Sequence, residues 1–164
     1  MNFLDERLVG SWSGSAVGAM EASGIAFLPD GRGWSRFDSV SGELAVARFR
    51  WHCPTAGRLA LRYTWRISGE WGADTEGFAA VRNSSAFEEV LETGYRIDHG
   101  RPPLYGPPGP TLLLDDPVEF EDVFHRSGGR GPVTPADDPS AARFPYEPSP
   151  RPVPGPVPRR RTGS

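Results

Sequence analysis

The sequence predicts an all-β protein, a closed antiparallel up-and-down β-barrel of about eight strands, followed by a disordered Pro-rich tail. Apolar and polar residues alternate with a period of two through most of the chain before residue 126, and helical periodicity is nearly absent. Turn residues interrupt this alternation at short intervals, which is typical of sandwiches and barrels. Beyond Arg126 prolines become dense and large apolar residues become rare, so this part cannot offset its chain entropy by burial.

The length and composition indicate one domain. A chain of 164 residues with 37% hydrophobic content can form a single hydrophobic core. We expect a barrel domain over residues 1–126 and a tail over residues 127–164. The single Cys53 excludes an internal disulfide, the N-terminus has no signal-peptide pattern, and no apolar run approaches the roughly 18 residues of a membrane span. We therefore expect a soluble, cytoplasmic protein that does not bind membranes.

The charged residues exclude several function classes. Every basic residue is arginine, so a Schiff-base lysine and the lysine of a phosphate-binding loop are absent. Acidic residues outnumber arginines before residue 126, whereas arginines outnumber acidic residues after it. An acidic body argues against nucleic acid as the main partner.

The N-terminal half contains two predicted hairpins after a first strand at residues 8–14. Residues 24–28 and 33–38 are expected to pair across the turn Pro29-Asp30-Gly31. Residues 44–53 and 59–67 form the second hairpin across Pro54-Thr55-Ala56-Gly57. In both strands of this second hairpin, aromatic residues alternate with arginines, which predicts an aromatic face.

The C-terminal half is less regular. Residues 68–88 lose the alternation, and we interpret them as a long connection that carries a short strand around residues 77–81. Alternation returns at 90–98 and is followed by a Pro/Gly-rich loop at 101–110. Two further strands, at 111–114 and 118–126, complete the barrel.

A short motif on the first strand resembles a known superfamily. The residues Gly10-Ser11-Trp12, the succession of strands and the final strand ending at Arg126 resemble the calycins, which include lipocalins, fatty-acid-binding proteins and nitrobindin-like barrels. In lipocalins a Gly-x-Trp on the first strand lies at the closed end, and an arginine of the last strand packs across the ring. The resemblance implies that Gly10, Trp12 and Arg126 plug one end of the barrel, where a guanidinium over an indole is favourable.

No cofactor or metal is expected. Residues 10–18 are similar to the glycine-spaced opening of haem-binding nitrobindins, which ligate haem iron through histidine. None of His52, His99 and His125 stands in a context that matches that ligand. His52 and Cys53 point to opposite faces of a strand and cannot share a metal ion.

The aromatic face predicts a binding site for a small apolar or aromatic molecule. An eight-stranded barrel either fills with side chains or holds one small ligand, and buried tyrosines need hydrogen-bond partners, which favours a lined cavity. The candidate ligand-binding residues are Phe49, Trp51, Tyr63, Trp65, Tyr95 and Phe124.

Two other functions stay open at this point, because a fold does not decide between binding and catalysis. The first is a metal-independent barrel enzyme that acts on a small apolar substrate in the same cavity. Its candidate catalytic residue is Asp122, which shares the face of Phe120 and Phe124 and would have a perturbed pKa inside a barrel. The second is a filled barrel that serves as a protein-interaction module, and the Pro/Arg-rich tail is a candidate for a weak protein partner.

Overall fold

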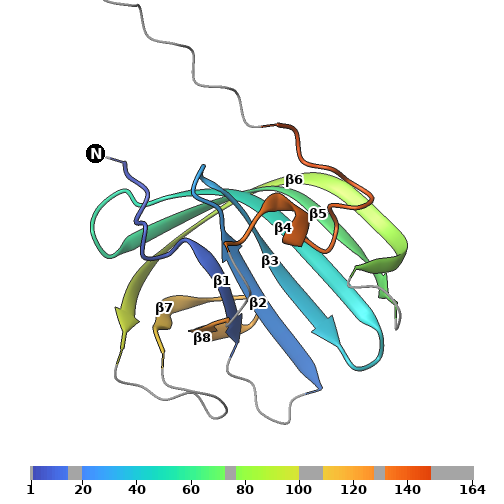
Figure 1. Cartoon of the computed structure of the whole chain (residues 1–164), viewed down its shortest axis with the longest axis horizontal. Helices are drawn as coiled ribbons and strands as arrows, with labels where there is room; N and C mark the ends of the chain where they lie inside the picture. Colours follow the sequence, from blue (N-terminus) through green and yellow to red (C-terminus); the bar gives the residue numbers. More distant parts are fainter. Residues whose placement is uncertain (1, 15–19, 73–76, 100–108, 128–131, 149–164) are drawn as a thin grey trace, which may run out of the picture.

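Eight antiparallel strands close into a barrel in which each strand pairs with the next along the chain and β8 pairs with β1 (Figure 1). The computed structural model describes residues 2–14, 20–72, 77–99, 109–127 and 132–148. The strands are β1 (Gly10–Gly14), β2 (Glu21–Phe27), β3 (Arg32–Ser39), β4 (Glu43–His52), β5 (Arg58–Trp71), β6 (Phe78–Asp98), β7 (Thr111–Val118) and β8 (Glu121–Arg126). The predicted up-and-down barrel is confirmed. Within the described residues there is no helix long and apolar enough to cross a membrane.

The predicted β2–β3 hairpin turns at Pro29-Asp30-Gly31. Gly31 has φ +87°, a left-handed conformation that glycine adopts without a steric penalty. Leu28 both receives a hydrogen bond from the Gly31 amide (3.2 Å) and donates one to the Arg32 carbonyl (2.8 Å). These bonds fix the register so that Ile25 and Phe27 face the interior while Ala26 and Leu28 face outward.

The structure differs from the expected long connection at residues 68–88. Strand β5 continues to Trp71 and β6 already begins at Phe78, so most of that stretch is paired strand. The pairing of β5 with β6 shifts register after Tyr63, after Ser68 and after Glu70. Each shift places an extra residue in the ladder and reverses the face of the residues that follow, which removes the alternation from the sequence.

The end of the barrel nearest the N-terminus is closed by Trp12 and Arg126. Trp12 is fully buried, and its indole Nε1 donates to the Leu8 carbonyl (2.9 Å). The Arg126 guanidinium lies 4.2 Å from the centre of the Trp12 ring. It also donates to the carbonyls of Val9 and Arg7, at 2.6 Å each, so it ties β8 to the segment before β1.

Gly10 leaves the space that this arginine needs. A Cβ atom at Gly10 would lie 2.4 Å from Arg126 Nη1, and Gly10 has φ +131°. The three residues of the predicted plug, Gly10, Trp12 and Arg126, therefore lie together at one end of the barrel.

We expect Trp12→Ala to lower the free energy of unfolding by about 3 to 5 kcal/mol, because it removes a large buried ring. Arg126→Ala should cost less, about 1 to 3 kcal/mol, because the ring remains while a cation–π contact and two hydrogen bonds are lost. Since the two side chains are in contact, the double variant should lose less free energy of unfolding than the two single variants lose in total. Urea unfolding of the four proteins measures this; strictly additive losses would show that the ring and the guanidinium do not interact.

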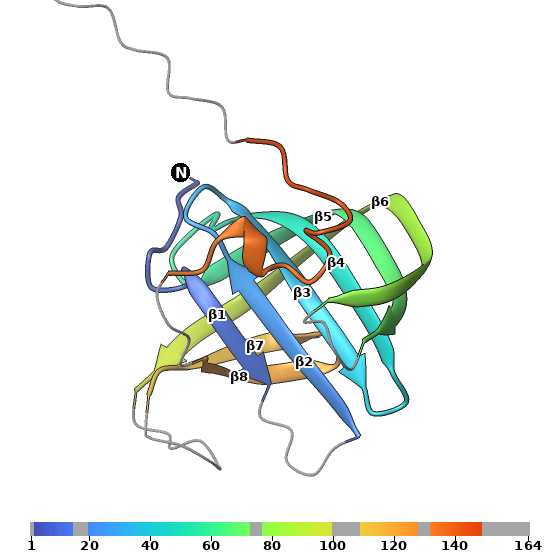
Figure 2. The same cartoon turned by 45° about the vertical axis from the view of Figure 1, so that its right-hand side comes forward.

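Residues 132–148 differ from the predicted boundary after Arg126. They lie across the outer face of β2, β3 and β4, as both views of the ribbon show (Figures 1 and 2). Val133, Phe144 and Tyr146 pack against an outward-facing apolar cluster of the barrel. This cluster consists of Ala26, Leu28, Trp34, Leu44, Val46, Ile67 and Phe78, with Trp65 and Val81 beside it. Residues 149–164 lie outside the described residues. The binding of a protein partner by the Pro-rich tail therefore stays a prediction.

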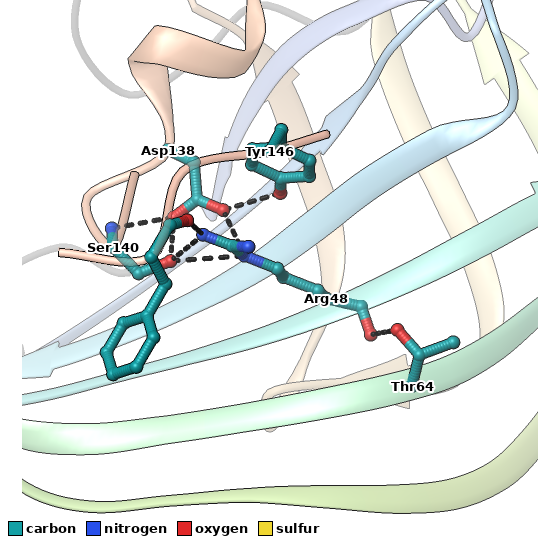
Figure 3. A network of polar contacts seen from close by, with 6 residues as sticks. Arg48, Thr64, Asp138, Ser140 and Tyr146 are labelled. Carbon is teal, nitrogen blue, oxygen red and sulfur yellow. Dashed lines mark hydrogen bonds and ion pairs between the residues drawn. The ribbon is translucent and has the colours of Figure 1, made fainter. Parts of the chain in front are cut away.

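Arg48 of β4 anchors this segment, which we call the C-terminal strap. Figure 3 shows its side chain extended toward Asp138, Ser140 and Tyr146. Arg48 Nε donates to the fully buried carboxylate of Asp138 (3.1 Å), and its Nη2 donates to Ser140 Oγ (2.8 Å) and to the Phe144 carbonyl. The Tyr146 hydroxyl donates to the same carboxylate (2.5 Å), and its ring lies 4.0 Å from the Arg48 guanidinium. A buried carboxylate with this many donors is fully compensated, which is why it is tolerated here.

We expect truncation after Arg126 to lower the Tm by about 5 °C or more, because it uncovers the outer apolar cluster. Truncation after Pro148 keeps the strap and is the matched control, with a Tm close to that of the full chain. Differential scanning calorimetry distinguishes the two. Equal Tm values for both truncated proteins would show that the strap does not stabilise the barrel.

Candidate functional site

A continuous row of aromatic rings runs through the interior from the closed end toward the opposite, open end. Phe27 contacts both Trp51 and Phe49, with ring centroids 5.1 Å and 5.8 Å apart. Phe49 then contacts Tyr63 (5.8 Å), and Tyr63 stacks on Phe87 of β6 (5.5 Å). Edge and tilted contacts at these separations are the preferred geometry of aromatic pairs. The rings near the closed end are therefore packed core.

All of the predicted ligand-binding residues except Trp65 belong to this interior cluster. Phe49, Trp51 and Phe124 are at most 2% exposed. Trp65 instead packs outward, against Phe144 of the C-terminal strap. Phe49 pairs with Tyr63 and Arg48 pairs with Trp65, so Thr64 is an extra residue in β5. This bulge turns Trp65 to the face opposite Tyr63, which strict alternation cannot predict.

Tyr95 lies at the closed end, where its hydroxyl is already engaged. It donates to Asp5 Oδ2 (2.7 Å), and Cys53 Sγ lies 3.5 Å from the same hydroxyl. Burial and these two neighbours raise the pKa of Tyr95. Arg7 donates to both oxygens of Asp5, at 3.0 Å and 2.7 Å. Tyr95 thus holds the N-terminal segment across the closed end.

Asp122 is not enclosed by the barrel. Its side chain is exposed at the start of β8, next to the turn that joins β7 to β8. The acidic residue that the fold brings to the barrel opening is Glu119, in that same turn. Glu119 and Phe120 have φ +50° and +68°, and this tight turn directs the Glu119 side chain toward β3. Within residues 115–122, the carboxylate that is hydrogen-bonded to a buried hydroxyl is that of Glu119, whereas the predicted Asp122 is exposed.

Tyr63, Ser35 and Glu119 form a polar cluster inside the open end. Ser35 is fully buried, and its hydroxyl donates to Glu119 Oε1 (2.9 Å). Ser23 of β2 donates to the Glu119 carbonyl (2.6 Å). Burial raises the pKa of Tyr63 to about 12, the negative charge of Glu119 contributes, and a hydrogen bond with Ser35 partly offsets both. Tyr63 is therefore a neutral hydroxyl at physiological pH.

The open end is partly accessible to solvent. Phe87 and Leu91 of β6 pack against the interior cluster, yet both remain partly exposed. Phe120, at the tip of the turn, is 86% exposed and contacts the half-buried Phe37 with ring centroids 5.7 Å apart. The exposed guanidinium of Arg66 lies 5.1 Å from the Phe87 ring centre. Apolar rings, hydroxyls and charges thus lie together at the open end, whereas at the closed end Trp12 is fully buried and Tyr95 and Asp5 are more than nine-tenths buried.

Two recesses lie on the outer surface of the barrel. One, of about 780 Å³, lies between β1, β2, β3 and the start of the C-terminal strap, and Trp34, Arg36 and Val133 contribute to its wall. The other, of about 680 Å³, lies beside Arg50, Trp65 and Tyr146. Both are bounded by the strap, so they result from its packing on the outer face.

Sequence patterns alone did not identify Ser35, Phe87 and Glu119 as site residues. Ser35 lies in a strand whose alternation is visible, so its interior position could have been read from Phe37 two residues on. Phe87 follows a register shift and Glu119 lies in a tight turn, and neither feature has a signature in the sequence here.

The geometry defines an antiparallel barrel with Trp12 and Arg126 at one end and the Tyr63, Ser35 and Glu119 cluster toward the other. Comparison with known protein families, with characterised proteins and with solved structures gives no match to this chain. The function therefore has to be argued from the chemistry of the site.

We expect Asp5→Asn to make the free energy of unfolding less dependent on pH between pH 4 and pH 2. The hydrogen bonds from Arg7 lower the pKa of Asp5 from 3.8 to about 2, so the folded state gains stability above pH 4 and loses it as the pH falls toward 2. The variant should lose about 2 kcal/mol at pH 6 and almost nothing near pH 2. Urea unfolding across this range measures the difference, with the exposed neighbour Glu6→Gln as control. A constant difference from pH 6 to pH 2 would contradict the assignment.

Proposed function

We propose that this protein is a lipocalin-like binding barrel that takes a small, planar apolar or aromatic molecule at its open end. The observation that carries the proposal is the stacked pair Tyr63 and Phe87, which forms the outermost part of the aromatic row and remains partly accessible at Phe87. Pockets of this kind bind by apolar contact with a few directed polar groups. Here the polar groups are the hydroxyl of Tyr63, the hydroxyl of Ser35 and the carboxylate of Glu119.

The packing of the interior supports a revised position for the ligand. Trp51, Phe49 and Phe124 fill the closed half, so the proposed site begins at Tyr63 and extends outward. The Trp12 and Arg126 stack supports the proposed relation to the calycins, because it reproduces the plug that the sequence motif implies.

The exposure of Asp122 weighs against the enzyme alternative as it was framed, because that acid lies outside the interior. The filled closed half favours, in part, the alternative of a filled barrel that serves as a protein-interaction module. Such a module would need an exposed apolar surface, and two exposed apolar residues, Val40 and Trp71, lie at the ends of β3 and β5. A probe-binding experiment distinguishes binding at the open end from binding at Val40 and Trp71.

We expect N-phenyl-1-naphthylamine, a neutral planar fluorophore, to bind the full-length protein with a Kd of about 1 to 50 μM. Phe87→Ala should weaken binding about tenfold, because the probe loses a ring contact. Ala45→Phe adds bulk on the interior side of β4 and should also reduce binding without removing a native ring. The measurement is a fluorescence titration, with circular dichroism confirming that each variant is folded.

The matched control is Val90→Ser, an exposed outward residue on the same strand as Phe87, which should bind like the wild type. Val40→Ser reports on the exposed apolar pair. Loss of binding in Val40→Ser but not in Phe87→Ala would place the probe outside the barrel and overturn the proposal. Absence of binding by the wild type would overturn it as well.

A further inference from the structure

The recess of about 680 Å³ beside the C-terminal strap lies on the outer face of β3, β4 and β5. Its wall combines apolar and cationic side chains: Trp65, Pro145 and Tyr146 contribute apolar surface, and Arg50 contributes a guanidinium. Ligand pockets have volumes of this order and a similar mixture of apolar walls with a few polar groups. The recess therefore offers space for a small molecule outside the barrel.

Arg50 contributes a positive charge that is not balanced by a partner. Its side chain is exposed, and its guanidinium forms no ion pair or hydrogen bond with a described residue. The two other arginines of the wall have acidic partners. Arg32 pairs with Asp30 (2.7 Å). Arg48 pairs with Asp138 (3.1 Å). Arg50 is therefore available to an incoming anion.

The cross-strand neighbours of Arg50 are also arginines. Arg50 lies opposite Arg32 of β3 and opposite Arg62 of β5. Directly opposite residues in an antiparallel pair have Cβ atoms about 5 Å apart, and like charges at such positions are destabilising. Arg62 pairs with Glu88 at 3.5 Å, but both side chains are largely exposed, so this pair compensates little. An anion bound at Arg50 would relieve the repulsion along this row.

Trp65 adds a hydrogen-bond donor without an acceptor. Its indole Nε1 is buried and has no hydrogen-bond partner among the described residues. Trp65 contributes to the wall of the recess and contacts Phe144 of the strap, with ring centroids 6.4 Å apart. Buried donors are rarely unpaired in folded proteins, and a bound group that supplies an acceptor is one explanation for such an atom. The oxygens of an anion are suitable acceptors for an indole N–H and for a guanidinium alike.

Glu147 is an acidic residue of the same wall and opposes an anion. Its side chain is exposed and forms no ion pair with a described arginine, while its backbone carbonyl accepts a hydrogen bond from Arg32 (2.8 Å). Because water and salt screen an exposed carboxylate, it weakens the attraction of the arginine row without cancelling it. Anion affinity should therefore be modest and should rise when Glu147 is neutralised.

We infer that this recess is a second ligand site, which binds small organic anions through a carboxylate or phosphate group. The acidic group binds the Arg50 guanidinium, whose planar set of donors matches two oxygens of a carboxylate or phosphate. The apolar part of the anion lies against the wall formed by Trp65 and Pro145. The site is on the outer face and does not require that a ligand bind at the open end.

The test is titration of the ¹⁵N-labelled full-length protein with benzoate and with phenyl phosphate, followed through the indole N–H signals in NMR spectra. Trp65→Phe and Trp71→Phe each remove one signal and so assign it. We expect the Trp65 signal to shift with a Kd of about 1 mM. The signal of Trp71, an exposed ring at the far end of β5, should not move. Benzyl alcohol, which has a similar ring without the charge, should leave both signals in place.

Three charge variants make the result specific. Arg50→Gln should weaken binding of the anions about tenfold, because a charged hydrogen-bond donor is lost. The matched control is Arg82→Gln, which removes an exposed arginine that pairs with Glu70 and should bind like the wild type. Glu147→Gln should tighten binding about threefold, because it removes the opposing charge.

Three results would overturn the inference. The first is a Trp65 signal that does not move with either anion. The second is equal binding of benzyl alcohol and benzoate, and the third is an equal effect of Arg50→Gln and Arg82→Gln. If the inference holds, the tighter of the two anions identifies the preferred acidic group as carboxylate or phosphate.

Discussion

The contact between Arg126 and Trp12 is the interaction on which the architecture depends. A sheet of eight strands closes only if its last strand finds its first, and Arg126 belongs to β8 while Trp12 belongs to β1. The same guanidinium bonds to two carbonyls of the N-terminal segment, so one side chain joins the barrel seam to its end closure. Closure removes both sheet edges and isolates the interior from water at this end.

The bulge at Thr64 determines how the rest of the surface is used. Without it, Trp65 would point inward beside Tyr63, and the outer face of β5 would be polar. With it, Trp65 and Ile67 turn outward next to Val46, and the outer face becomes a second apolar surface. Such a surface would be an aggregation risk if it were exposed. The C-terminal strap covers it, and the ion pair of Arg48 with Asp138 fixes the position of that strap.

The features that the sequence predicted correctly are those set by local rules. Regular alternation placed Phe49 and Trp51 inside, and the Pro29-Asp30-Gly31 turn marked the β2–β3 hairpin. The positions of Trp65 and Glu119 were missed because a bulge between β4 and β5 and a tight turn between β7 and β8 break the regular alternation without a signature in the sequence. The strap was missed for a related reason. Its few apolar residues, such as Phe144 and Tyr146, are too sparse to form a core and gain burial only on a surface formed by other strands.

The two ends of the barrel differ in the side chains that occupy them. Trp12, Phe27 and Trp51 occupy the closed half, and Tyr63 stacks on Phe87 farther along the aromatic row. Among the polar groups here, Ser35 is fully buried and Glu119 remains partly exposed. That combination is poor for stability, since Ser35 and Glu119 replace apolar packing with a single hydrogen bond. The proposed binding of a ligand at this end gives a physical reason for such a cost on one side of an otherwise apolar interior.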